Sequence, residues 1–278
     1  MNTANTLDGK FVSEGSWRPD LFKGKVAFVT GGAGTICRVQ TEALVLLGCK
    51  AAIVGRDQER TEQAAKGISQ LAKDKDAVLA IANVDVRNFE QVENAVKKTV
   101  EKFGKIDFVI AGAAGNFVCD FANLSPNAFK SVVDIDLLGI KRFHPFVSAT
   151  FHYYGVPFQG HVGAAKAGID ALAKNLAVEL GPLGIRSNCI APGAIDNTEG
   201  LKRLAGKKYK EKALAKIPLQ RLGSTRDIAE STVYIFSPAA SYVTGTVLVV
   251  DGGMWHLGTY FGHELYPEAL IKSMTSKL

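Results

Sequence analysis

The sequence predicts an α/β protein built on one doubly wound parallel sheet. Short, nearly continuous apolar runs alternate with amphipathic helical patterns along most of the chain, which is typical of parallel strands covered by helices on both faces. With 278 residues, 47% of them hydrophobic, the chain is long enough for one large core, and no linker or repeat divides it. We therefore expect an irregular lead-in over 1–20, one domain over 21–255 and a C-terminal tail over 256–278.

The expected elements follow one another as strand–helix units. Strand patterns are short and apolar, whereas helix patterns repeat apolar residues at intervals of three or four. The expected strands cover 25–30, 51–54, 77–86, 106–110 and 246–250. The expected helices cover 57–73 and 91–103, with another between the first strand and residue 47.

One segment conflicts with this alternation. Only eight residues separate Gly139 from Ser148, where we expect a crossover helix and most of the fifth strand. A crossover between parallel strands takes roughly a dozen residues or more, and Pro145 interrupts a continuous helix. We expect a truncated crossover at 139–148, produced by an internal deletion or a sequence artefact, and a sheet that is poorly covered on one face.

Composition and charge exclude several classes of protein. No apolar run approaches the ~18 residues of a membrane span, and residues 1–10 lack the apolar core of a secretory signal. The net charge of +6 comes without a basic run of five, so we expect no nucleic-acid partner. We expect the basic balance to reflect a mildly basic surface, with small phosphate-bearing ligands as the alternative. The scattered cysteines predict reduced thiols in an intracellular compartment, with neither a metal site nor a disulfide framework. They are Cys37, Cys49, Cys119 and Cys189.

A glycine cluster and two arginines point to a phosphorylated dinucleotide. Gly31, Gly32 and Gly34 lie between a strand and a helix, where backbone N–H groups and a helix N-terminus favour a pyrophosphate. At the end of the second strand, Arg56 stands where an acidic residue would bind a ribose 2′-hydroxyl, and Arg60 follows one helical turn later. Guanidinium groups match phosphate geometry, so we expect NADPH, with solvated surface arginines as the alternative.

The order of these motifs resembles the short-chain dehydrogenase/reductase family, a Rossmann fold, over roughly residues 20–255. The carrying motifs are Thr30-Gly31 with Thr35-Ile36-Cys37, Asp85-Val86, Ala111-Gly112-Ala113-Ala114-Gly115-Asn116-Phe117, Pro192-Gly193-Ala194-Ile195 and Asp251-Gly252-Gly253. Thr35 and Cys37 replace two glycines of the family's motif, and we expect the Cys37 side chain to crowd the contact between helix and strand. The resemblance implies these cofactor-binding residues: Gly31, Gly32, Gly34, Thr35, Ile36, Arg56, Arg60, Asp85, Val86, Lys166, Pro192, Gly193 and Ile195.

The catalytic half departs from most of this family. Lys166 has the context of the family's lysine, but Val162 stands in place of the tyrosine that protonates a carbonyl, and Ala149 in place of the serine, next to Ser148. With Asp170 and the loop 197–201, these departures resemble the peroxisomal 2,4-dienoyl-CoA reductases, the fungal ones most. The resemblance implies an oxidoreductase acting on carbon–carbon double bonds, which reduces a trans-2,trans-4-dienoyl-CoA to a trans-3-enoyl-CoA in the β-oxidation of unsaturated fatty acids.

The same resemblance implies roles for individual residues. Lys166 would hold the nicotinamide ribose and supply positive charge, Asp170 would orient the water that delivers the proton, and Asp136 would join their network. A helix-surface carboxylate is the alternative for Asp170. The implied substrate contacts are Arg87, Phe117, Ser125, Asn127 and Arg203.

Location, partners and competing functions complete the expectations. The final Ser276-Lys277-Leu278 matches a peroxisomal matrix address read by the import receptor, and the family forms homodimers. Two alternatives stay open: an NADPH-dependent carbonyl reductase of the same family, and a non-catalytic relative that only binds nucleotide.

Overall fold

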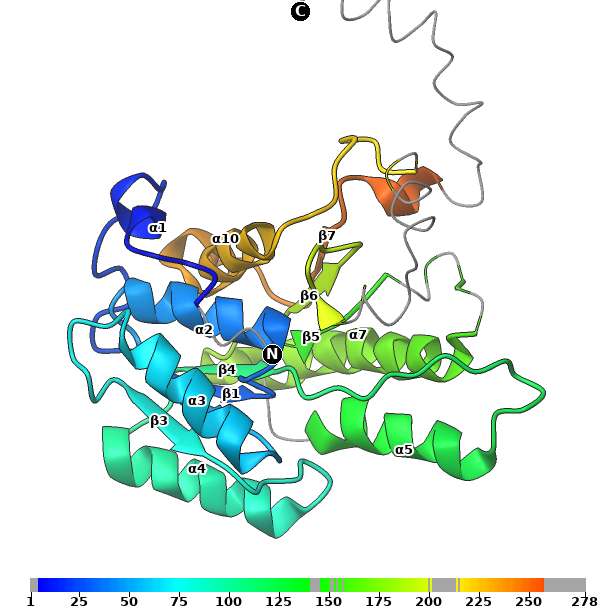
Figure 1. The fold of residues 1–278 in the computed structure, drawn as a ribbon, viewed down its shortest axis with the longest axis horizontal. Helices are drawn as coiled ribbons and strands as arrows, with labels where there is room; N and C mark the ends of the chain where they lie inside the picture. Colours follow the sequence, from blue (N-terminus) through cyan, green and yellow to red (C-terminus); the bar gives the residue numbers. More distant parts are fainter. Residues whose placement is uncertain are drawn as a thin grey trace, which may run out of the picture.

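The computed structural model describes residues 5–140, 146–150, 153, 155, 156, 158–199, 201, 214 and 216–257. Seven strands form one sheet in the order β3-β2-β1-β4-β5-β6-β7, and every neighbouring pair is parallel (Figure 1). The predicted doubly wound α/β fold is confirmed. The direction of winding reverses between β1 and β4, and ligands of such sheets bind at the carboxyl ends of the strands at this switch point.

The strands and helices alternate along the chain. The strands are β1 (Val26–Thr30), β2 (Lys50–Val54), β3 (Val78–Ile81), β4 (Phe108–Ala111), β5 (Phe146–Val147), β6 (Cys189–Pro192) and β7 (Val247–Val250). The helices are α1 (Lys10–Ser13), α2 (Thr35–Leu46), α3 (Gln58–Ser69), α4 (Phe89–Phe103), α5 (Pro126–Asp136), α7 (Gly160–Leu180) and α10 (Thr225–Phe236). Short 3₁₀ turns are η1 (Leu138–Ile140), η2 (Gly181–Leu183), η3 (Pro238–Ala240) and η4 (Met254–Leu257). The strand expected over 77–86 ends at Ile81, and Asn83 adopts a left-handed φ of 59° two residues later.

Local sequence explains where the helices begin. The carboxylate of Asp57 accepts a hydrogen bond from the Arg60 N–H at the start of α3. At the start of α10, Ser224 and Asp227 form a reciprocal capping box. Such caps satisfy the N–H groups that a first helical turn leaves without partners.

Helices α2, α3 and α10 cover one face of the sheet together with part of the lead-in. Leu7, Phe11 and Phe22 are buried in the core on this face. The carboxylate of Glu42 in α2 accepts hydrogen bonds from the backbone N–H groups of Thr6 and Leu7, at 3.0 and 2.9 Å. Apart from the four-residue α1, the described part of the lead-in is irregular, and its apolar side chains complete the core.

Helices α4, α5 and α7 lie on the other face, where α5 packs against α7 (Figure 1). The crossover helix α5 lies before Gly139, not within 139–148 as expected, and it has 11 residues. Strand β5 has two residues, and only Ala111 and Phe146 align β4 with it, whereas both of its residues align with β6. The crossover is thus shortened in strand β5 and in the segment between α5 and β5. Residues 141–145 of that segment lie outside the described residues.

Candidate active site

A cavity of about 710 Å³ lies at the carboxyl ends of the central strands. It gathers most of the predicted site residues from seven separate segments of the chain. They are Gly31, Gly34, Thr35, Ile36, Arg56, Arg60, Asp85, Val86, Phe117, Asp136, Lys166, Pro192, Gly193 and Ile195. Gly32 does not line the cavity but faces β2, where a Cβ on it would lie 2.6 Å from the Cβ of Ile53. Its role is to let the turn pack on β2.

The glycine turn prepares the cavity for an anion. Gly31 has a left-handed φ of 67°, and a Cβ on it would lie 2.9 Å from the carbonyl oxygen of Gly112. Helix α2 begins after Gly34 with no side-chain cap. Its first N–H groups stay available to a ligand phosphate, which matches the predicted pyrophosphate site.

Cys37 packs tightly beside this turn, at the contact between helix and strand where crowding is expected. Its side chain is 4% exposed, and burial raises the pKa of the thiol to about 12. A Cβ on residue 112 would lie 2.0 Å from the Cys37 Sγ. Because residue 112 is glycine, the sulfur occupies the space that a side chain there would fill.

The two arginines at the expected 2′-phosphate site differ in their surroundings. Arg56 is exposed where β2 ends and lines the cavity. Arg60 is engaged: its Nε donates to the carbonyl oxygen of Ala33 at 3.3 Å, and its Nη2 lies 2.5 Å from the Glu199 Oε1. Arg56 is therefore the better placed for an incoming phosphate, and the contact of Arg60 with Glu199 joins α3 to the loop after β6.

Asp85 and Arg87 form a pair of their own at the next strand end. The Arg87 Nε lies 2.9 and 3.0 Å from the two Asp85 carboxylate oxygens, and these hydrogen bonds lower the pKa of Asp85. Asp85 lines the cavity, as the resemblance implies, but Arg87 is not among its lining residues.

Lys166 and Asp136 meet at the inner end of the cavity. The Lys166 Nζ lies 3.1 Å from the Asp136 Oδ2 and donates to the carbonyl oxygen of Val147 at 3.1 Å. The other Asp136 oxygen, Oδ1, accepts from the Gly115 N–H at 2.7 Å. Both side chains are nearly inaccessible, at 9% and 1% exposure. The turn after β4, the end of α5 and the middle of α7 are therefore joined at one buried ion pair.

Asp170 faces a different cavity. Its Oδ2 accepts a hydrogen bond from the Tyr153 hydroxyl at 3.1 Å, and both residues line a second cavity of about 690 Å³ with Lys174 and Trp255. Burial and the charge of Asp170 raise the pKa of Tyr153. The structure thus brings Lys166 and Asp136 together and turns Asp170 toward Tyr153. Tyr153 was missed because no local motif marks a tyrosine 17 residues before its partner.

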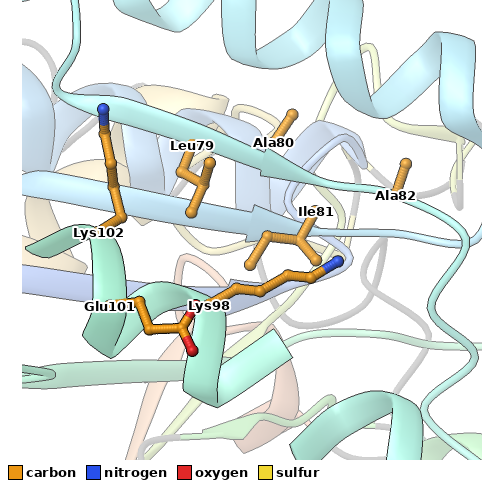
Figure 2. Close-up of a pocket in the computed structure, with 7 residues that line it drawn as sticks. All are labelled: Leu79, Ala80, Ile81, Ala82, Lys98, Glu101 and Lys102. Carbon is orange, nitrogen blue, oxygen red and sulfur yellow. The ribbon is translucent and has the colours of Figure 1, made fainter. Parts of the chain in front are cut away.

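A third cavity, of about 420 Å³, lies apart from these groups (Figure 2). Leu79 and Ile81 of the edge strand β3 line it opposite Lys98, Glu101 and Lys102 of α4 (Figure 2). Lysines beside an edge strand hinder its pairing with another chain. Its polar lining consists of exposed side chains on one face of α4, and we assign it no chemistry.

Comparisons with known proteins identify the family. A family model described as enoyl-(acyl carrier protein) reductase matches residues 32–255. The chain is 93% identical to the peroxisomal 2,4-dienoyl-CoA reductase of Saccharomyces cerevisiae over 292 aligned positions that cover both proteins completely. It is 45% identical to the peroxisomal 2,4-dienoyl-CoA reductase of Rattus norvegicus over 253 residues, 85% of this chain and 86% of the relative. The chain belongs to the short-chain dehydrogenase/reductase family.

Solved structures of this family share the fold. Levodione reductase superposes with a TM-score of 0.77 at 28% identity and covers 86% of this chain and 100% of its own. The 3-ketoacyl-(acyl-carrier-protein) reductase of Brucella melitensis, solved with NADH, gives 0.74 at 28% identity over 84% and 99% of the two chains. The yeast alignment spans 292 positions against 278 residues here, so at least 14 of its positions have no counterpart in this chain, in agreement with a shortened crossover.

Within the dehydrogenase/reductase framework, the position of the tyrosine is apolar in this chain. Val162 is 3% exposed and packs with Val132, Ala165 and Phe117. Ser148, the neighbour of the expected serine position, lines the cavity, and its buried Oγ makes no hydrogen bond among the described residues. Ser148 is therefore a polar group of the cavity, although the family's serine position falls on the next residue, Ala149.

Ser125 and Asn127 do not line the cavity. Ser125 caps α5 by accepting from the Ala128 N–H at 3.2 Å, and Asn127 is exposed in the first turn of that helix. Arg203 and the tripeptide 276–278 lie outside the described residues. Among the residues described, no three His, Cys, Asp or Glu side chains are grouped to hold a metal, and no helix is long and apolar enough to cross a membrane.

Proposed function

We propose that this chain is an NADPH-dependent 2,4-dienoyl-CoA reductase that produces a trans-3-enoyl-CoA. The observation that carries the proposal is that one site contains both a buried Lys166–Asp136 ion pair and an apolar residue, Val162, in the tyrosine's place. A carbonyl reductase needs a proton donor beside the carbonyl oxygen. A conjugated diene instead needs an apolar wall and a positive charge near its thioester. The relatives at 93% and 45% identity carry the corresponding name.

The residues of the cavity fit NADPH. The uncapped start of α2 suits the pyrophosphate, and the exposed Arg56 suits the 2′-phosphate. When bound, NADPH supplies a hydride to C5 of the diene, while the electrons shift toward the thioester oxygen and C2 takes a proton. Lys166 has three N–H donors. The Val147 carbonyl oxygen accepts from one of them, Asp136 supplies an opposite charge 3.1 Å away, and we assign a remaining donor to the cofactor ribose or the thioester oxygen.

Proton delivery is assigned to Asp170. Its carboxylate is held by Tyr153 on the side of α7 that faces the second cavity. In this proposal, a water held by Asp170 and Tyr153 reaches C2 from the second cavity, one helical turn along α7 from Lys166, so the proton crosses between the two cavities. Asp136 is a positioning residue, because it holds the Lys166 ammonium in place.

Substrate contacts, location and assembly belong to the same proposal. Phe117 contacts the acyl-CoA from the cavity wall, and the further substrate contacts of this proposal are Arg87, Ser125, Asn127 and Arg203. The protein works in the peroxisomal matrix and enters through the import receptor that reads Ser276-Lys277-Leu278. Its yeast and rat relatives are named as peroxisomal enzymes. It assembles as a homodimer.

The deciding experiment follows NADPH absorbance at 340 nm with two substrates in parallel, 2,4-hexadienoyl-CoA and a 3-ketoacyl-CoA, and measures NADPH binding. Oxidation with 2,4-hexadienoyl-CoA is expected. Oxidation only with a 3-ketoacyl-CoA would instead make the chain a carbonyl reductase. NADPH binding without oxidation by any substrate would make it a non-catalytic binder.

A further inference from the structure

Three large apolar side chains stand in solvent beside the candidate active site. Val118 is 53% exposed, Phe121 is 80% exposed and Phe158 is 56% exposed. We call these three residues the apolar patch. Exposed apolar groups that cluster together commonly mark a binding surface, whereas single ones do not.

Contacts between two chain segments bring the patch together. The Cys119 N–H donates to the Phe158 carbonyl oxygen at 3.3 Å. The Gln159 side chain donates to the Phe117 carbonyl oxygen at 3.2 Å, and a Cβ on Gly160 would lie 3.8 Å from the Phe121 ring. The loop after β4 therefore lies along the start of α7, and its aromatic side chains share one surface.

The patch lies next to a residue of the cavity wall along the chain. Phe117 lines the cavity and stacks on the buried His161 with ring centroids 4.3 Å apart. The next residue, Val118, already belongs to the patch. The only acid in the loop between Phe117 and Phe121 is Asp120, whose carboxylate accepts hydrogen bonds from Asn123 within its own turn. The patch therefore begins one residue after the cavity wall at Phe117.

The backbone at Phe158 is held in an unfavourable conformation. Its φ is 64°, in the left-handed region that bulky residues rarely adopt. Such strain persists where the surrounding structure maintains it, and it is commonest at ligand sites. Here it coincides with an exposed phenyl ring.

We infer that the apolar patch binds the distal hydrocarbon of a long acyl chain whose reactive end lies in the cavity. This inference rests on the proposed function and adds a preference for long acyl chains to it. The occupant is a linear hydrocarbon, because the three side chains of the patch are apolar and open to solvent, and the patch follows the wall residue Phe117 directly in the chain. Each methylene that reaches the patch leaves water, so affinity should increase with chain length.

The test measures equilibrium binding of hexanoyl-, octanoyl-, decanoyl- and lauroyl-CoA to the full-length protein, which requires no turnover. At half burial, each added methylene strengthens binding about twofold in the wild-type protein. Phe121→Ser and Phe158→Ser should flatten this dependence, so that the ratio of the hexanoyl-CoA to the lauroyl-CoA Kd approaches one. Tyr242→Ser, at a fully exposed aromatic residue elsewhere, should keep the wild-type ratio.

Other outcomes overturn the inference. If both patch variants keep the wild-type dependence of Kd on acyl-chain length, the hydrocarbon does not bind to this surface. An equal loss of affinity for every chain length would assign the patch to the coenzyme A arm. A change of oligomeric state in the patch variants, measured by sedimentation, would assign it to a contact between copies. Turnover of 2,4-hexadienoyl-CoA tests the proposed function separately from all of these results.

Discussion

The contact between Cys37 and Gly112 makes a quantitative prediction about the cofactor turn. In Gly112→Ala, the new Cβ would lie 2.0 Å from the Cys37 Sγ and 3.3 Å from the Thr30 carbonyl oxygen. The first distance is far inside van der Waals contact, so α2 or β4 must shift. Overpacking a core in this way typically costs about 1–3 kcal/mol of unfolding free energy. Because α2 carries the proposed pyrophosphate site, NADPH affinity should fall as well.

Removing the sulfur should rescue this variant. In Cys37→Ala, the closest Cys37 atom to the new group becomes the Cβ at 3.5 Å, which is an ordinary contact. Gly112→Ala should therefore cost little in the Cys37→Ala background, and the double-mutant cycle should give a coupling of about 1–3 kcal/mol. Urea denaturation and fluorescence titration with NADPH measure the two effects. Additive effects in the four proteins would refute the steric argument.

Three further predictions concern the cofactor, the proton and pH. Arg56→Ala should reduce the ratio of the NADH Kd to the NADPH Kd by about ten- to a hundredfold, because it removes a charge-assisted hydrogen bond to the 2′-phosphate. An unchanged ratio would count against the 2′-phosphate assignment. Asp170→Asn should lower kcat by about 10²–10⁴ while NADPH binding is retained, whereas Lys166→Ala should impair both; near-normal turnover of Asp170→Asn would leave that carboxylate structural. Hydrogen bonds from Arg221 hold the pKa of Asp227 below its usual range, so its stabilising contribution is present at neutral pH and is lost as the pH falls below about 4. Urea midpoints at pH 7 and pH 3 should therefore differ less in Asp227→Asn, and an equal difference would contradict the linkage.

Much of the fold and of the cofactor site could be predicted because the signals are local. The apolar run over 25–30, the glycines after it and the helix that follows are adjacent in sequence, and the structure places them as β1, the turn and α2. The replacement of a tyrosine by Val162 four residues before Lys166 is likewise visible in the sequence. Spacing along one helix settles which residues stand near each other on its surface.

The amino-acid sequence by itself determined the alternation of strands and helices, the nucleotide-binding turn and the shortness of segment 139–148. Only the tertiary structure decided which distant side chains meet. It paired Cys37 with Gly112, Lys166 with Asp136 and Tyr153 with Asp170. The physical reason is that packing across a sheet brings together groups separated by tens of residues, and their complementarity in size and charge has no periodicity along the chain.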